Sequence, residues 1–258
     1  PRDEDAAALC RDRIAPMFEG SARLARHTSG PGAFTSEKID LDRMTVYLAG
    51  ANSPAGLASH PIRRLFLDEL DKYPAYAGQD ADPVKLSTQR TKNFWNRQVI
   101  KASTPTTRRG YIHREYQASD RRRFHLPCAK CGLYQVMIFD QVRWPEACRD
   151  AKTMRTERLA RYRCLGCEAE WDDAARNRAL AKGRWVPEGG EVLPGGHVKP
   201  PPGPPSDHRG YAISALYSPW LSLSEVAAEF LESKQDVARL MAFVTGWLAE
   251  IWEEKLEE

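Results

Sequence analysis

The stretch LFLDE at residues 65–69 decides the fold, because two carboxylates follow directly on a short apolar run. Such a run, bounded by polar residues, predicts a buried strand, and a carboxylate after a parallel strand is held at the carboxyl edge of the sheet. Mg²⁺ prefers hard oxygen ligands of this kind. We therefore expect Asp68 to hold Mg²⁺ and Glu69 to orient and deprotonate an attacking water. The alternative is that both acids only begin a helix, whose dipole favours them there.

A second strand is predicted by the run VIKA at residues 99–102, which leads into the hydroxyl residues Ser103 and Thr104. In many ATPase and helicase cores, the strand beside the Mg²⁺-binding strand ends in such residues, which sense the γ-phosphate of ATP and couple its hydrolysis to movement. A Ser/Thr-Pro turn that merely closes the strand is the alternative. The order of the two strands favours an ATPase, in which Asp68 and Glu69 form the Walker B motif.

The rest of this half of the chain fits an α/β layer. Residues 5–17 predict an amphipathic helix, residues 44–48 (MTVYL) a further strand, and residues 83–94 a helix between the two strands. Short apolar runs with intervening helices favour a largely parallel sheet. No Gly-Lys-Ser or Gly-Lys-Thr occurs, so either the phosphate-binding loop lies before residue 1 or the chain is no ATPase. The predicted fold is part of a P-loop ATPase sheet.

Four of the six cysteines form two Cys-x-x-Cys pairs, namely Cys128, Cys131, Cys164 and Cys167. Each pair presents two thiolates on a tight turn, and together they predict a tetrahedral S₄ site. A site with four thiolates leaves no coordination position for water, so we expect a structural Zn²⁺ in an inserted zinc ribbon. A redox pair is the alternative, but two paired turns are the more specific signal for a metal.

Arginines gather just before the first cysteine pair, at Arg121, Arg122 and Arg123. They are candidates for contact with DNA phosphates, and the alternative is a solvated face or pairing with acidic side chains. The net charge of +3 is too small to indicate a nucleic-acid partner, so DNA contact rests on this local cluster. No apolar run approaches the roughly 20 residues that span a bilayer, so no membrane partner is expected.

Shifts in composition predict four segments. Residues 1–122 form the latter part of an ATPase domain and residues 123–187 the zinc ribbon. Residues 188–207 are rich in Pro and Gly and predict a linker without regular structure. Residues 208–258 contain the run YAISAL, which predicts a strand that returns to the first domain, and a C-terminal helix begun by Ser222 or Ser224.

Six blocks of the sequence resemble, in order, the lambda-type (GpA) phage terminase large subunit. They are GANSPA at 50–55, LDELD at 67–71, ASTPT at 102–106, SDRRRF at 119–124, CAKCG at 128–132 and LYSPW at 216–220. The resemblance covers nearly the whole chain and is weakest in the Pro-rich segment.

The resemblance implies an ATP-driven motor that packages viral DNA into a procapsid and cuts the concatemer. It implies ATP, Mg²⁺ and structural Zn²⁺ as cofactors, and double-stranded DNA, the small terminase subunit, the procapsid portal and further copies of the chain as partners, all in the cytoplasm of the infected bacterium. By this alignment the chain begins after the phosphate-binding loop and ends just before the nuclease, so we expect no activity from it alone.

Two other functions stay open. One is a non-catalytic zinc-ribbon module that binds nucleic acid or protein, with the α/β part as a scaffold. The other is a helicase-like ATPase unrelated to packaging. A phosphate-binding loop upstream would favour an ATPase over the binding module, and a nuclease downstream would favour packaging over a helicase.

Overall fold

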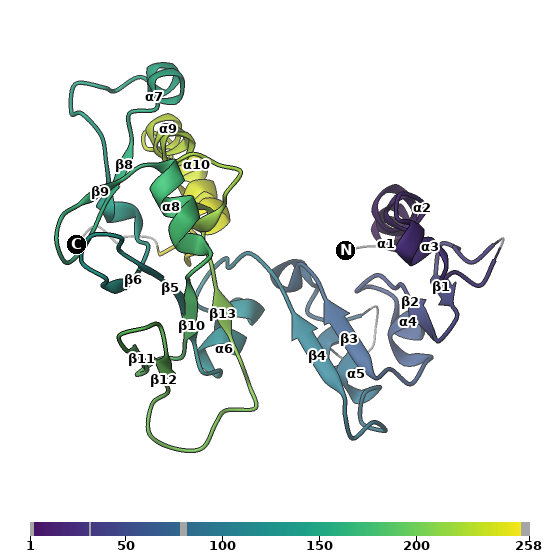
Figure 1. The fold of residues 1–258 in the computed structure, drawn as a ribbon. Coiled ribbons are helices and arrows are strands. Elements are labelled where there is room, and N and C mark those ends of the chain that lie inside the picture. Colours follow the sequence, from purple (N-terminus) through teal and green to yellow (C-terminus); the bar gives the residue numbers. More distant parts are fainter. Residues whose placement is uncertain (1–2, 31, 78–81, 254–258) are drawn as a thin grey trace. The chain divides into compact units, whose positions relative to one another are not determined.

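The computed structural model describes residues 3–30, 32–77 and 82–253. The chain divides into two compact units, Pro1–Ser103 and Thr104–Glu258, which are considered separately (Figure 1). Both mix helices and strands, which confirms the α/β class. In the part of the chain that the structure describes, no helix is both long and apolar enough to cross a bilayer.

The first unit begins with a helical stretch and a hairpin. The predicted helix over 5–17 is confirmed as α1 (Asp3–Leu9), a π-helical turn (Cys10–Ile14) and α2 (Ala15–Glu19), followed by the short α3 (Ala22–Ala25). Strand β1 (Lys38–Leu41) pairs antiparallel with β2 (Met44–Tyr47). The expectation that residues 44–48 join a parallel sheet was therefore wrong. Only two residues separate the strands, a connection that permits antiparallel pairing alone.

The two strands that decide the fold do pair in parallel. Strand β3 (Arg64–Leu67) lies beside β4 (Gln98–Lys101), with Leu67 opposite Lys101. Helix α4 (Pro54–Ala58) precedes them, and α5 (Pro83–Gln89) lies between them in sequence, begun by the side chain of Asp82. Helix α5 ends earlier than expected, and a turn replaces its predicted last residues. Among the residues described, the parallel sheet has only these two strands.

The second unit is built around β5 (Arg122–Pro127), which follows α6 (Tyr111–Gln117). Strands β6 (Tyr134–Val136) and β10 (Arg184–Val186) pair antiparallel with β5. Strand β13 (Tyr211–Ala212) is the predicted return strand, but it pairs parallel with β5 and not with a strand of the first unit. Asp120 explains this pairing, since its carboxylate and N–H bind Gly210 and His208 respectively and align the two segments.

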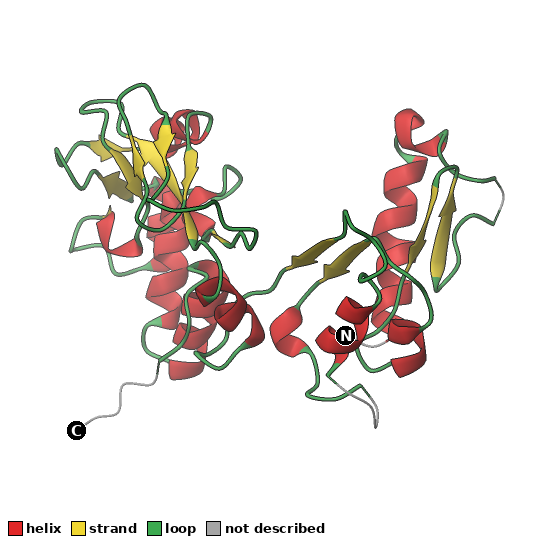
Figure 2. Cartoon of the chain, turned by 90° about the horizontal axis from the view of Figure 1, so that it is seen from below, coloured by secondary structure: helices red, strands yellow, loops and turns green. Residues whose placement is uncertain are grey.

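A smaller antiparallel sheet carries the second pair of cysteines. It consists of β7 (Val142–Arg143), β8 (Arg161–Arg163) and β9 (Glu170–Trp171), with α7 (Ala151–Glu157) before β8. Helix α8 (Asp173–Leu180) follows, and the side chain of Asp172 caps its start. The strands of the unit gather on one side and its longer helices on the other (Figure 2).

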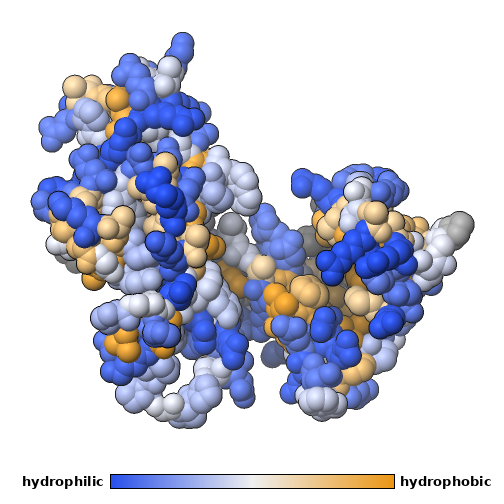
Figure 3. All heavy atoms as spheres, in the orientation of Figure 1, coloured by the Kyte–Doolittle hydropathy of each residue, from blue (hydrophilic) through white to orange (hydrophobic). Residues whose placement is uncertain are grey.

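Two helices complete the unit, α9 (Leu223–Ser233) and α10 (Val237–Ala242), and a π-helical turn (Phe243–Trp247) extends the second. Ser222 begins α9 through a capping box with Glu225, which settles the choice between two serines. Val226 and Phe243 are buried with Met154 of α7 in one core. On the face seen in Figure 3, the surface of this unit is mainly hydrophilic, with apolar residues in small groups.

The Pro- and Gly-rich segment was expected to lack regular structure, and that expectation was wrong. Strand β11 (Glu191–Val192) pairs antiparallel with β12 (Val198–Lys199). Gly195 and Gly196 lie between these strands with positive φ angles of 88° and 84°. Glycine adopts such angles without steric cost, so the composition that suggests a flexible linker here serves a tight turn.

Candidate functional site

The predicted ATPase residues meet at the carboxyl edge of β3 and β4. Asp68 directly follows β3, and Ser103 follows β4 after one residue. The pairing of the strands continues past their ends, because the N–H of Ala102 donates to the carbonyl of Leu67 at 2.8 Å. The hydroxyl of Ser103 then accepts from the N–H of Asp71 at 3.1 Å. Ser103, the predicted coupling residue, is thus bonded to the acidic segment itself.

Glu69 has an unusual backbone. Its φ angle is 53°, in the left-handed region that few residues other than glycine adopt. Its N–H donates to a carboxylate oxygen of Asp68 at 3.0 Å, and its own carboxylate pairs with Lys72 at 3.2 Å. Residues held in this region cluster at active sites, which makes the angle an independent reason to examine Glu69. A short 3-10 turn (Leu70–Lys72) follows, so the helix alternative describes the local backbone in part.

Two features surround these acids. Burial, together with the nearby charge of Asp68, raises the pKa of Tyr73 above its ordinary value. The boundary between the compact units falls between Ser103 and Thr104, so the two residues of the predicted coupling motif belong to different units. The sequence alone does not indicate either feature.

The four predicted zinc ligands come together. Cys128 and Cys131 lie on the turn after β5, and Cys164 and Cys167 on the turn after β8. All four Sγ atoms lie within 4.8 Å of one another. Two of the separations, Cys128 to Cys167 and Cys131 to Cys164, are 3.8 Å. A tetrahedron with Zn–S bonds of about 2.3 Å has S···S edges of about 3.8 Å, so the cluster has the dimensions of an S₄ zinc site.

The first turn depends on a glycine. The N–H of Gly132 donates to the carbonyl of Cys128 at 2.9 Å, and its φ angle is 76°. This closes the turn so that both thiols of the pair face the same side, as expected from the sequence.

Gln135 is a member of the cluster that the sequence did not reveal. It lies in β6 and is only 3% exposed. Its amide nitrogen donates to Sγ of Cys164 at 3.1 Å, and its amide oxygen accepts from the N–H of Leu165 at 2.8 Å. A side chain of β6, which pairs with β5, therefore holds the turn that carries Cys164 and Cys167. A glutamine in a predicted strand carries no signal of this role in a single sequence.

The surroundings of Cys164 favour its thiolate. Burial alone raises the pKa of this thiol, but backbone N–H groups of Cys167 and Gly166 oppose that effect. The amide of Gln135 acts in the same direction, and the pKa of Cys164 falls below its ordinary value, whereas that of Cys131 in the same cluster rises. Metal ligation requires the thiolate, so this environment prepares a ligand.

The three candidate DNA-binding arginines differ from one another. Arg121 forms an ion pair with Glu188 and donates to Gln117 at 3.1 Å. Arg122 pairs with Asp120 at 2.8 Å and is partly buried. Pairing with acids, the alternative to DNA contact, therefore holds for these two. Arg123 is exposed, and within the described ranges no carboxylate forms an ion pair with it.

Comparison with known proteins adds the family. Residues 1–185 match the model of the phage terminase large subunit gpA, ATPase domain, and residues 208–258 match that of its endonuclease domain. The chain is 26% identical over 202 residues to "Terminase, large subunit" of Escherichia phage lambda, covering 74% of this chain and 30% of that protein. It is 25% identical over 199 residues to the protein of the same name from Enterobacteria phage P21, with the same coverage. No solved structure matches it.

The second match corrects one expectation. We expected the nuclease to lie wholly beyond this chain, but the endonuclease model begins at residue 208 and includes β13, α9 and α10. The match also favours packaging over a helicase-like ATPase. The chain spans about a third of the length of the relatives it matches. With both models in order along its length, the chain belongs to the gpA family of phage terminase large subunits.

Proposed function

We propose that this chain forms part of an ATP-driven motor that packages double-stranded viral DNA into a procapsid. The observation that carries the proposal is the common edge at which Asp68, Glu69 and Ser103 end two parallel strands, in a chain of the terminase family. The proposed partners are DNA, the small terminase subunit, the procapsid portal and further copies of this chain. The proposed location is the cytoplasm of the infected bacterium.

The chemistry follows from the side chains at this edge. Bound Mg²⁺ and ATP would supply the electrophilic phosphoryl group and neutralise its charge. Asp68 would hold the metal, because β3 fixes it at the edge of the sheet. Glu69 would accept the proton of the attacking water. Among the residues described, its carboxylate is held by the ion pair with Lys72 alone, in which Lys72 is exposed and Glu69 Oε2 is buried without a hydrogen bond, so turning the carboxylate toward a water breaks one ion pair and no hydrogen bond.

Coupling is proposed to pass through Ser103. Its hydroxyl is bonded to the N–H of Asp71, three residues beyond Asp68. A change at the acidic segment on hydrolysis would therefore reach the end of β4 directly. Because Thr104 already belongs to the second unit, the same change would reach the start of that unit within one residue.

Zinc is proposed to have a structural role. The four thiolates would join the turn after β5 to the turn after β8. Strands β5 and β8 belong to different sheets, which no strand pairing connects among the described residues. With all positions filled by sulfur, the metal would activate no water.

The test of the function uses the full-length protein, in which we expect a phosphate-binding loop. Glu69→Gln keeps the shape of the side chain but removes its basicity, so ATP turnover should be lost while nucleotide binding stays within a few-fold of wild type. Glu37→Gln, an exposed acid in the loop before β1, is the matched control and should leave both unchanged. Turnover by Glu69→Gln close to that of wild type would refute the role of Glu69.

A further inference from the structure

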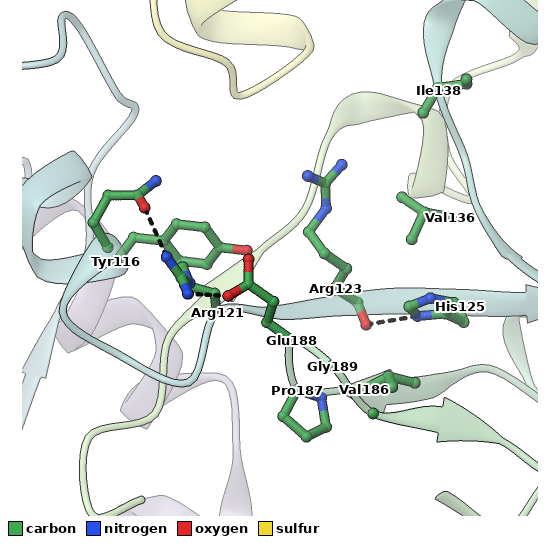
Figure 4. Close-up of a pocket in the computed structure, with 12 residues that line it drawn as sticks. Tyr116, Arg121, Arg123, His125, Val136, Ile138, Val186, Pro187, Glu188 and Gly189 are labelled. Carbon is green, nitrogen blue, oxygen red and sulfur yellow. Dashed lines mark hydrogen bonds and ion pairs between the residues drawn. The ribbon is translucent and has the colours of Figure 1, made fainter. Parts of the chain in front are cut away.

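A cavity of about 480 Å³ opens on the second unit beside β5 (Figure 4). Its lining comes from α6, from β5 and β6, and from the segment that follows β10. The proposed ATPase and zinc sites use none of its lining residues.

The side chains of β5 on this face follow from the alternation of a strand. Successive side chains of a strand point to opposite faces, so Arg123 and His125 line the cavity, whereas Arg122 faces away and pairs with Asp120. Arg121, which precedes β5 with a φ angle of 45°, lines the cavity as well. The run of three arginines thus divides into one that stabilises the fold and two at a cavity.

The two cations at the cavity are not equally available. Arg121 is held by Glu188 and Gln117. Arg123 is exposed, and its guanidinium extends away from the Arg121–Glu188 pair (Figure 4). Desolvation raises the pKa of the Glu250 carboxyl and the charge of Arg123 lowers it, but the side chain of Glu250 is exposed and forms no ion pair with Arg123 among the residues described.

The rest of the lining suits one anionic group bound by Arg123 beside an apolar wall of the cavity. Val136, Ile138 and Val186 form that wall, and an apolar wall strengthens the attraction between a cation and a bound anion. His125 is not a second cation. Its Nδ1 lies 3.1 Å from the carbonyl of Arg123, and burial lowers its pKa, which favours the neutral ring at pH 7.

We propose that this cavity binds one phosphate of the DNA backbone, with Arg123 as the principal donor and Arg121 as a second donor when Glu188 releases it. A guanidinium donates two parallel hydrogen bonds to a phosphate, and such a contact carries no base specificity, as a motor that must move along any sequence requires. The inference rests on the proposed packaging function. Binding of an acidic peptide would use the same guanidinium and is the competing outcome.

The experiment measures binding of a fluorescent 20-base-pair duplex by residues 1–258 across a salt series. Arg123→Gln should flatten the slope of log K against log salt by about 0.9, the value for one lost phosphate contact. Arg178→Gln removes the same charge from α8, outside the cavity, and should leave the slope unchanged. Glu188→Gln frees Arg121 and should tighten binding at constant salt. This last variant acts in the opposite direction, so loss of folding cannot mimic it.

A second readout locates the contact. The ring resonances of His125 should shift on addition of inorganic phosphate and of the duplex in wild type, but not in Arg123→Gln. Duplex binding with an unchanged slope in Arg123→Gln overturns the inference and leaves the packaging function standing. His125 resonances that shift on addition of poly-glutamate but not on addition of the duplex would also overturn the inference. Failure of the packaging function is detected separately, by ATP turnover of full-length Glu69→Gln.

Discussion

Gln135 gives the sharpest prediction about the zinc cluster. Gln135→Leu leaves an apolar side chain one atom shorter, and it removes the donor to Cys164 and the acceptor for Leu165. Each of these hydrogen bonds contributes about 1 kcal/mol, and the N–H of Leu165 loses its partner. Loss of a hydrogen bond to a metal ligand typically lowers metal affinity about 10- to 100-fold, or about 1.4 to 2.8 kcal/mol. The two estimates agree, so we expect zinc affinity to fall by that factor.

The assay is competition for zinc between the protein and a chromogenic chelator at neutral pH, read as the chelator concentration that removes half of the metal. Gln235→Leu is the matched control, since Gln235 is an exposed glutamine of the same unit, between α9 and α10. It should behave as wild type. Equal zinc retention by Gln135→Leu and Gln235→Leu would refute the argument that Gln135 holds the second cysteine turn.

Three further predictions concern the second unit. Cys128→Ser should lower the zinc content from about one equivalent toward none, measured by metal analysis of the purified chain, and full retention of zinc would count against the S₄ site. Arg176→Met should destabilise the unit by about 2 to 4 kcal/mol in denaturant unfolding, because the fully buried guanidinium donates to the carbonyls of Leu216 and Leu221. Burial raises the pKa of Tyr217 from 10.0 to about 12, so its contribution to stability is complete below pH 10 and is lost as the pH rises toward 12. At pH 11 the loss should be on the order of 1 kcal/mol, and unfolding at pH 8 and 11 should show a smaller drop for Tyr217→Phe.

The sequence predicts best where local chemistry and tertiary structure agree. The cysteine pairs could be placed in one cluster because metal ligation requires that residue type at that spacing. Asp68 and Ser103 could be placed at one edge because two apolar runs, each followed by polar residues, imply adjacent parallel strands. The start of α9 could likewise be predicted to within two serines, because a serine side chain satisfies a nearby N–H group at the start of a helix, as Ser222 does.

The sequence fails where a partner distant in the chain decides the outcome. Residues 44–48 have the composition of a core strand, but a two-residue turn commits them to a hairpin. Strand β13 pairs with β5 because Asp120 bonds to Gly210, 90 residues away. The same limit concealed Gln135, and it made three adjacent arginines look equivalent although strand alternation and acidic partners separate them.

The central claim is that Asp68 and Glu69 have different roles at one metal–nucleotide site. Electron paramagnetic resonance of Mn²⁺, added with a non-hydrolysable ATP analogue to the full-length protein, tests it most directly. Asp68→Asn should weaken Mn²⁺ binding about tenfold or more, because a charged oxygen ligand is lost, whereas Glu69→Gln should bind Mn²⁺ as wild type does. Mn²⁺ affinity that is unchanged in Asp68→Asn, or equally reduced in both variants, would contradict the assignment.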